Sequence, residues 1–195
     1  MAEIQLDETR AKNAVRWWKY ATECEAKQDD YGAFFAIWIA FIILAKDYQV
    51  TYCSHLRRTY GDQQAVECCF SHAQALILEA IRDTSLSENR RRLSARYDGA
   101  ILRSDTLTQT TRGHLTDLAR VWQLNQTDDG RESRGVRDLL LQVRNGLFHG
   151  TKMYNDDTAN REDDDRQLLR DLNPIAFAIV TRILNQPGPH QQLLR

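Results

Sequence analysis

Proline, glycine and lysine are scarce in this chain. Its 195 residues include 3 prolines, 9 glycines and only 5 lysines beside 21 arginines. The low proline and glycine content argues against long disordered linkers. Arginine suits a bidentate grip on phosphate, but genomic base composition explains the same bias, and we favour that interpretation.

An excess of charge of either sign is also missing. The formal net charge is −1, from 26 basic and 27 acidic residues. Because binding to nucleic acid over a wide surface requires a positive field, any such site on this chain must be local. The composition is otherwise that of a globular protein, with 42% hydrophobic and 27% charged residues, and the length suits one domain.

Cysteine is represented by Cys24, Cys53, Cys68 and Cys69, and no C-x-x-C pattern occurs. Cys68 and Cys69 are adjacent on an expected helix, so the set fits neither a zinc site nor a disulfide framework. We therefore expect reduced thiols in a cytoplasmic protein that holds no metal and no other cofactor.

Several sequence motifs of enzymes are absent, namely GxxxxGK[ST], GxGxxG, HExxH and GxSxG. Their absence argues against nucleotide hydrolysis, dinucleotide binding, zinc proteolysis and esterase chemistry. The first residues have no apolar signal core. The longest apolar run, residues 33–45, has 13 residues, whereas a bilayer span needs roughly 20. We expect this run to form a helix buried on nearly all sides, in a core or at a subunit interface, with no membrane partner.

Helical periodicity recurs along the whole chain, and no segment shows the alternation of a strand. The apolar stripes predict helices over residues 8–28, 31–48, 62–81, 85–96, 107–122 and 136–147, and a last helix near 165–183 that follows a polar loop over 151–164. Pro174 either restarts that last helix at its first turn or kinks one continuous helix. We predict an all-α fold of about six or seven helices, in a single helical bundle domain over residues 1–195 with an N-terminal helix within 1–28.

Three groups of charged residues suggest binding sites, and each also has a simpler explanation. The aspartates match no calcium-binding loop, and negative charge just before a helix complements its dipole. The arginine clusters suit phosphates or solvated helix faces alike. The histidines lack a companion at metal-ligand spacing, so we expect hydrogen-bonded structural histidines. These residues are Asp156, Asp157 and Asp163 to Asp165; Arg57, Arg58 and Arg90 to Arg92; and His55, His72, His114 and His190.

The segment VRNGLFHG, residues 143–150, places Arg144, Asn145 and His149 at the end of an amphipathic helix. Chance alone supplies about 1.6 arginine-to-histidine pairs at such spacings in a chain of this composition, so only the context is informative. In a regular helix Arg144 and His149 point about 140° apart. Gly146 and Gly150 loosen or end the helix, which brings His149 round, or a second copy of the chain completes the site. The spacing favours a composite site at a dimer contact.

The segment VRNGLFHGTK, residues 143–152, resembles the R-N-x-x-x-H signature of HEPN domains. The segment over 165–180 is similar to the helix that commonly follows, and FFAIWIAF over 34–41 is similar to the early buried helix. Together the pieces span a recognisable core of about 30–185. The resemblance implies an all-α domain that forms homodimers and acts as a metal-independent endoribonuclease in toxin–antitoxin pairs, CRISPR effectors or anti-phage defence.

The resemblance assigns Arg144 and His149 as catalytic residues, with Asn145 beside them. Histidine, with a pKa near 6.5, transfers protons near neutral pH, and two copies across a dimer supply both a base and an acid. Arginine suits the charged phosphate of the transition state. Asn145 either orients His149 or binds the substrate. The expected products are a 2′,3′-cyclic phosphate and a 5′-hydroxyl.

HEPN toxins paired with nucleotidyltransferases often carry a tyrosine two residues after the histidine, where this chain has Thr151, so neutralisation by adenylylation is not expected.

Two alternatives to this enzyme stay open. The chain can instead be a non-catalytic module that binds RNA or a protein partner, such as an antitoxin or a component of a defence system. The motif can also be a coincidence at an ordinary helix end.

Overall fold

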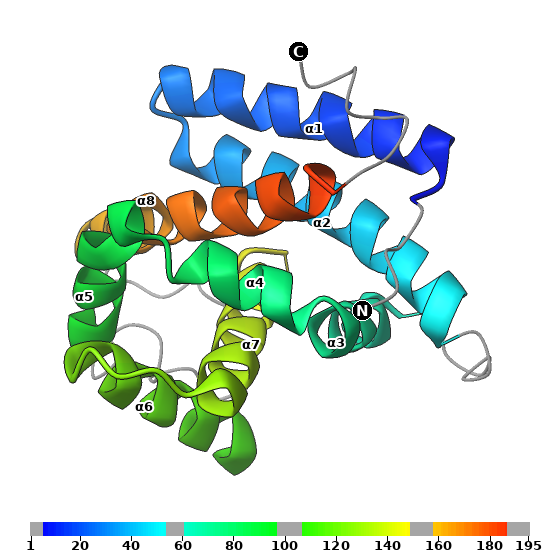
Figure 1. The fold of residues 1–195 in the computed structure, drawn as a ribbon. Coiled ribbons are helices and arrows are strands. Elements are labelled where there is room, and N and C mark those ends of the chain that lie inside the picture. Colours follow the sequence, from blue (N-terminus) through cyan, green and yellow to red (C-terminus); the bar gives the residue numbers. More distant parts are fainter. Residues whose placement is uncertain (1–5, 54–60, 97–106, 149–157, 187–195) are drawn as a thin grey trace. The chain divides into compact units, whose positions relative to one another are not determined.

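The computed structural model describes residues 6–53, 61–96, 107–148 and 158–186. These residues form eight α-helices and one short 3-10 helix, and no strand occurs among them, which confirms the all-α prediction. The helices are α1 (Glu8–Ala26), α2 (Asp30–Tyr52), α3 (Asp62–His72), α4 (Gln74–Ile81), η2 (Thr84–Leu86), α5 (Ser87–Arg96), α6 (Gln109–Gln123), α7 (Asp129–Phe148) and α8 (Thr158–Leu184). Figure 1 shows them along the chain.

The chain divides into two compact units. Unit 1 comprises Met1–Ile81 with Ile175–Arg195, and unit 2 comprises Arg82–Pro174. The division falls within α8, which is one continuous helix with Pro174 inside it, so the helix does not restart at the proline. The prediction of a single domain over 1–195 stays a prediction.

The first two helices of unit 1 form an antiparallel pair joined by a short turn (Figure 1). The Asp29 side chain accepts a hydrogen bond from the Gly32 amide at 2.9 Å and so caps α2. A Cβ atom at Gly32 would overlap the Asp29 carboxylate and lie 3.1 Å from the Cys24 sulfur, so only glycine fits beneath the cap.

Helix α2 is the centre of unit 1, and most of its apolar side chains are buried. Phe34, Ile37 and Leu44 are completely buried, and the rings of Phe41 and Phe70 meet edge to face, which packs α2 against α3. The helix continues past the apolar run and has 23 residues, with a mean hydropathy of 1.6 over its most apolar 18-residue stretch. Length alone therefore does not exclude a membrane span, contrary to the prediction. Since 72% of that stretch is buried inside the protein, it is a core helix in this structure.

The C-terminal part of α8 and the residues just after it belong to unit 1, where two hydrogen bonds join them to distant parts of the sequence. Trp18 Nε1 donates to Thr181 Oγ1 at 3.0 Å, and Gln186 Nε2 donates to Tyr48 Oη at 2.7 Å. Both bonds satisfy polar atoms that would otherwise be costly to place against the apolar core.

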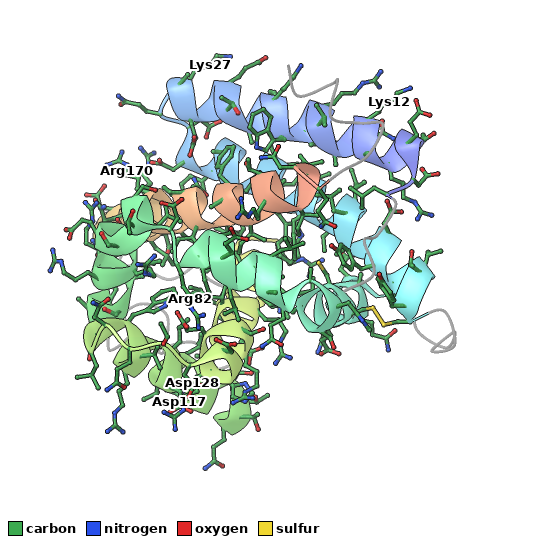
Figure 2. All side chains as sticks on the ribbon, in the orientation of Figure 1. Lys12, Lys27, Arg82, Asp117, Asp128 and Arg170 are labelled. Atoms are coloured by element: carbon green, nitrogen blue, oxygen red, sulfur yellow. A yellow bond between two sulfur atoms is a disulfide. The ribbon has the colours of Figure 1, made fainter. Side chains whose placement is uncertain are left out.

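Unit 2 is built on the pair α6 and α7, whose backbones approach closely at Gly135. A Cβ atom at Gly135 would lie 2.5 Å from the Leu118 Cβ and 3.0 Å from the His114 carbonyl oxygen. Arg82, labelled in Figure 2, donates from Nε to the buried Glu132 carboxylate at 2.9 Å and so joins the start of the unit to α7. These contacts fix the helix that carries the predicted catalytic motif.

Candidate functional site

Arg144 and Asn145 lie within the last two turns of α7. The helix is regular through Gly146 to Phe148, so Gly146 does not end it as the sequence suggested. Val143 is buried, whereas Arg144 is half-buried and Asn145 is exposed. Arg144 therefore emerges at the margin of the apolar face of α7, where a guanidinium can reach solvent while its stem stays packed.

A hydrogen bond joins these two neighbouring side chains. Arg144 Nη1 donates to Asn145 Oδ1 at 2.8 Å. Because adjacent residues on a helix point about 100° apart, the bond holds the guanidinium across the helix surface. It also orients the Asn145 amide, whose nitrogen keeps its two donors. The contact supports a role in which Asn145 positions Arg144, in addition to the two roles considered from the sequence.

A small hollow lies next to this pair, between the end of α7 and the first half of α8. Its volume is about 10 Å³, room for roughly one water molecule. Arg144 and Asn145 do not line this hollow. The lining residues are Val143, Gly146, Leu147, Asp165, Leu168 and Leu169.

The third predicted catalytic residue, His149, lies outside the described residues, as do Gly150, Thr151 and Lys152 of the same motif. The described part of the candidate site is therefore the Arg144–Asn145 pair. The pairing of Arg144 with His149, within one chain or across two, stays a prediction.

The acidic residues before the last helix have a different setting from the expected one. Helix α8 begins at Thr158, so residues 158–164 are helical and the prediction of a loop over 151–164 is wrong there. Asp163 and Asp164 are exposed on this helix. The sequence misled because a run of charged residues has no apolar stripe, although it is fully compatible with a solvated helix. Asp156 and Asp157 lie outside the described residues.

The arginine cluster over residues 90–92 is engaged within unit 2. Arg91 pairs with Glu88 at 2.7 Å, and Arg92 Nε lies 3.3 Å from the buried Asp171 carboxylate. Arg90 Nη1 donates to the Asp83 carbonyl oxygen at 2.9 Å. These contacts favour a structural role over phosphate binding. Arg57, Arg58, His55 and His190 lie outside the described residues.

His114 and Asp138 form a pair that the sequence did not reveal. His114 Nδ1 lies 2.7 Å from Asp138 Oδ2, and Arg137 Nε donates to the other oxygen, Asp138 Oδ1, at 2.8 Å. His114 is half-buried on α6, and Asp138 is buried on α7. The bond agrees with the expected hydrogen-bonded histidine. A carboxylate that orients an imidazole also occurs in proton-transfer sites, so this pair is a second candidate. Its only signal in the sequence is a polar residue beside the apolar stripe of each helix.

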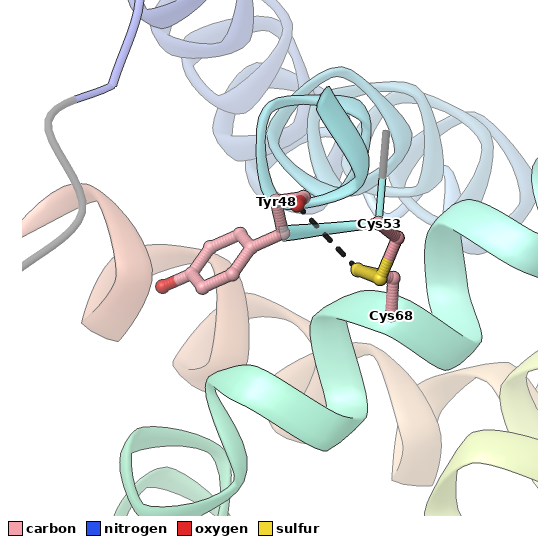
Figure 3. The surroundings of a disulfide bond; sticks show 3 residues. All are labelled: Tyr48, Cys53 and Cys68. Carbon is pink, nitrogen blue, oxygen red and sulfur yellow. Dashed lines mark hydrogen bonds between the residues drawn. A yellow bond between two sulfur atoms is a disulfide. The ribbon is translucent and has the colours of Figure 1, made fainter. Parts of the chain in front are cut away.

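Two cysteines are joined in a disulfide, so the prediction of reduced thiols is wrong for them. Cys53 and Cys68, 15 residues apart, are bonded where the end of α2 meets α3, with their Cα atoms 6.5 Å apart (Figure 3). Cys24 and Cys69 are free and buried. Adjacency of Cys68 and Cys69 was uninformative, because neighbouring residues on a helix point in different directions and only Cys68 is bonded to Cys53.

Comparisons with models of protein families, with curated proteins and with solved structures gave no match for this chain. The similarity to HEPN domains therefore rests on the residues of the motif and on the helices around it.

Proposed function

We propose that this chain is a HEPN-type, metal-independent endoribonuclease that acts as a homodimer in the cytoplasm, as a toxin or an anti-phage defence effector. The observation that carries the proposal is the Arg144–Asn145 hydrogen bond at 2.8 Å, in the same motif as His149, which follows Asn145 by four residues. A permanently charged group is thereby oriented on the last turns of α7, and a histidine, whose ordinary pKa lies near 6.5, follows it in the sequence.

The proposed reaction follows from these residue types. His149 of one chain removes the proton from a ribose 2′-hydroxyl, and the oxygen attacks the adjacent phosphorus. The bond from phosphorus to the 5′-oxygen breaks, and His149 of the second chain donates a proton to that oxygen. Arg144 stabilises the extra negative charge on the phosphate, and Asn145 holds Arg144 in place. The products are a 2′,3′-cyclic phosphate and a 5′-hydroxyl.

A non-catalytic binding module is the second candidate, and an exposed aromatic cluster on unit 1 favours it. Tyr20 is 48% exposed and Phe35 is 42% exposed, and both rings meet Trp17 edge to face at centroid distances of 6.1 and 6.3 Å. Exposed aromatic rings bind nucleobases by stacking or form the centre of protein interfaces.

Cleavage of a mixed RNA population in the presence of EDTA tests the proposal. We expect cleavage by the wild type and a loss of about 100-fold or more in Arg144→Ala and His149→Ala, because each removes a group that acts in the transition state. Asn145→Ala should lose about tenfold, and adding it to Arg144→Ala should cause little further loss, because Asn145 acts through Arg144.

Two controls separate this site from its competitors. Arg134→Ala removes an exposed arginine from the same helix and should leave cleavage unchanged. His114→Ala tests the second histidine and should also leave cleavage unchanged. Full activity in His149→Ala, or loss only in His114→Ala, would overturn the proposal. No cleavage of any RNA by the wild type would favour the binding module.

A further inference from the structure

Cys53, Cys68 and His72 form a cluster in unit 1 that the proposed ribonuclease chemistry does not use. Cys53 is the C-cap residue of α2, and the other two lie four residues apart on α3. Residues at that spacing lie on the same face of a helix. The sulfur atoms and an imidazole nitrogen all lie within 4.8 Å of one another. Figure 3 shows the two cysteines where the helices meet.

We propose that the reduced form of this cluster binds one Zn²⁺ ion through the Cys53 and Cys68 thiolates and the His72 imidazole. Zinc takes sulfur ligands at about 2.3 Å and histidine nitrogen at about 2.0 Å in tetrahedral geometry. This geometry separates neighbouring ligand atoms by roughly 3.5 to 3.8 Å. Since the three ligand atoms already lie within 4.8 Å of one another, side-chain rotation is enough to reach those separations.

The surroundings of the cluster suit a metal ligand set. The His72 ring stacks on Tyr52 with centroids 4.5 Å apart and an interplanar angle of 10°, which restricts the orientation of the imidazole. His72 is exposed, so a metal held by these three ligands keeps a fourth position open to water. The Cys68 sulfur lies 3.4 Å from the Tyr48 carbonyl oxygen (Figure 3). When the disulfide is reduced, the Cys68 thiol can donate a hydrogen bond to this oxygen.

The disulfide and the zinc site exclude each other because both use the same two sulfurs. A cellular dithiol reduces the bond between Cys53 and Cys68 by exchange: two electrons and two protons pass to these sulfurs, and the dithiol becomes a disulfide. Zinc then displaces the two thiol protons as the thiolates bind it. Disulfides are rare in a reducing cytoplasm, so the zinc-binding form is the one expected there.

Neighbouring Cys69 supplies no ligand in this scheme. Its side chain is completely buried, and its sulfur does not belong to the cluster formed by Cys53, Cys68 and His72. Only Cys68 of the adjacent pair is therefore a metal ligand, and the expected stoichiometry is one zinc ion per chain.

The test uses the full chain, reduced with a phosphine, stripped of metal with a chelator and kept free of oxygen. Zinc is added in competition with a chromogenic chelator, and Co²⁺ is added separately so that thiolate-to-cobalt charge-transfer absorption reports sulfur ligation. We expect one Zn²⁺ per reduced wild-type chain and that absorption band. Cys53→Ser and Cys68→Ser should abolish the band, and His72→Ala should weaken zinc binding by at least about tenfold.

Two controls keep the result decisive if a variant folds poorly. Cys24→Ala removes a buried free cysteine outside the cluster and should bind zinc as the wild type does. The oxidised wild type, with its disulfide intact, should bind none at the same concentrations. Equal binding by the oxidised and reduced wild type, substoichiometric binding by the reduced wild type, or undiminished binding by Cys68→Ser would overturn the proposal. None of these outcomes depends on RNA cleavage.

Discussion

Alanine substitution at Gly113 and at Gly135 should change stability in opposite directions, although both glycines lie inside helices of unit 2. Gly113 is exposed on α6, and a Cβ atom there would meet nothing within 4 Å. Gly113→Ala should therefore raise the free energy of unfolding by about 1 kcal/mol, the difference in helix propensity between the two residues.

Gly135→Ala gains the same propensity but introduces a clash. The new Cβ would lie 2.5 Å from the Leu118 Cβ and 3.0 Å from the His114 carbonyl oxygen, and neither atom moves without its backbone. Overpacking of this kind costs about 1–3 kcal/mol, so the net effect should be a loss of up to about 2 kcal/mol. The two variants should then differ by about 1–3 kcal/mol in the free energy of unfolding.

Urea unfolding followed by circular dichroism measures this difference, and thermal unfolding provides a second readout. For a chain of this size, 1 kcal/mol corresponds to roughly 2–4 °C in Tm. Gly113→Ala should melt above the wild type and Gly135→Ala below it. Equal stabilisation of Gly135→Ala and Gly113→Ala would show that α6 and α7 do not approach closely at Gly135. The geometry of the His114–Asp138 pair, which depends on that approach, would then be contradicted as well.

Two further predictions concern pH and subunit assembly. Burial raises the pKa of Tyr48 to about 12 in the folded chain, whereas its ordinary pKa is near 10. The folded state therefore keeps the phenol proton more tightly than the unfolded state does. The resulting contribution to the free energy of unfolding is complete below pH 10 and is lost as the pH rises from 10 to 12. Between pH 10 and 12 the free energy of unfolding, measured by urea titration, should fall less for Tyr48→Phe than for the wild type. An equal fall in both proteins would contradict the raised pKa of Tyr48. For assembly, wild type mixed with an inactive Arg144→Ala/His149→Ala chain, after subunit exchange, should cleave RNA in proportion to the square of the wild-type fraction. Strict proportionality to that fraction would show that each chain carries its own complete site.

The sequence predicted helices well where one face of each is apolar. The stripe along α7 has this form, whereas α2 was identified as a core helix by its continuous apolar run. The predicted ends of the helices were less accurate where polar residues flank the apolar stripe. Helix α2 begins at Asp30 with Asp29 as its cap, one residue before the predicted start, because either aspartate suits the cap position. The break between α3 and α4 at Ala73 carries no proline or glycine and so left no local signal.

The residues of a candidate site could be predicted from the sequence where they are close together in the chain. Arg144 and Asn145 are neighbours in the motif, so the sequence identified both residues, but the hydrogen bond between them was not predicted. The Cys53–Cys68 bond depends on the packing of α2 against α3, and the spacing of the cysteines does not encode that packing. Asp138 and His114 meet across two helices for the same reason.

The proposed dimer also depends on contacts between residues that are not neighbours in one chain. Within one regular helix, Arg144 and a histidine five residues later point about 140° apart, and α7 is regular through Phe148. Arg144, oriented by Asn145, lies at the margin of the apolar face in the last turns of α7. A second copy related by a twofold axis would bring another Arg144 and another His149 to the same surface, because a twofold contact repeats each residue. We therefore propose pairing across two chains, and the relevant distance is the one between Arg144 of one chain and His149 of its partner.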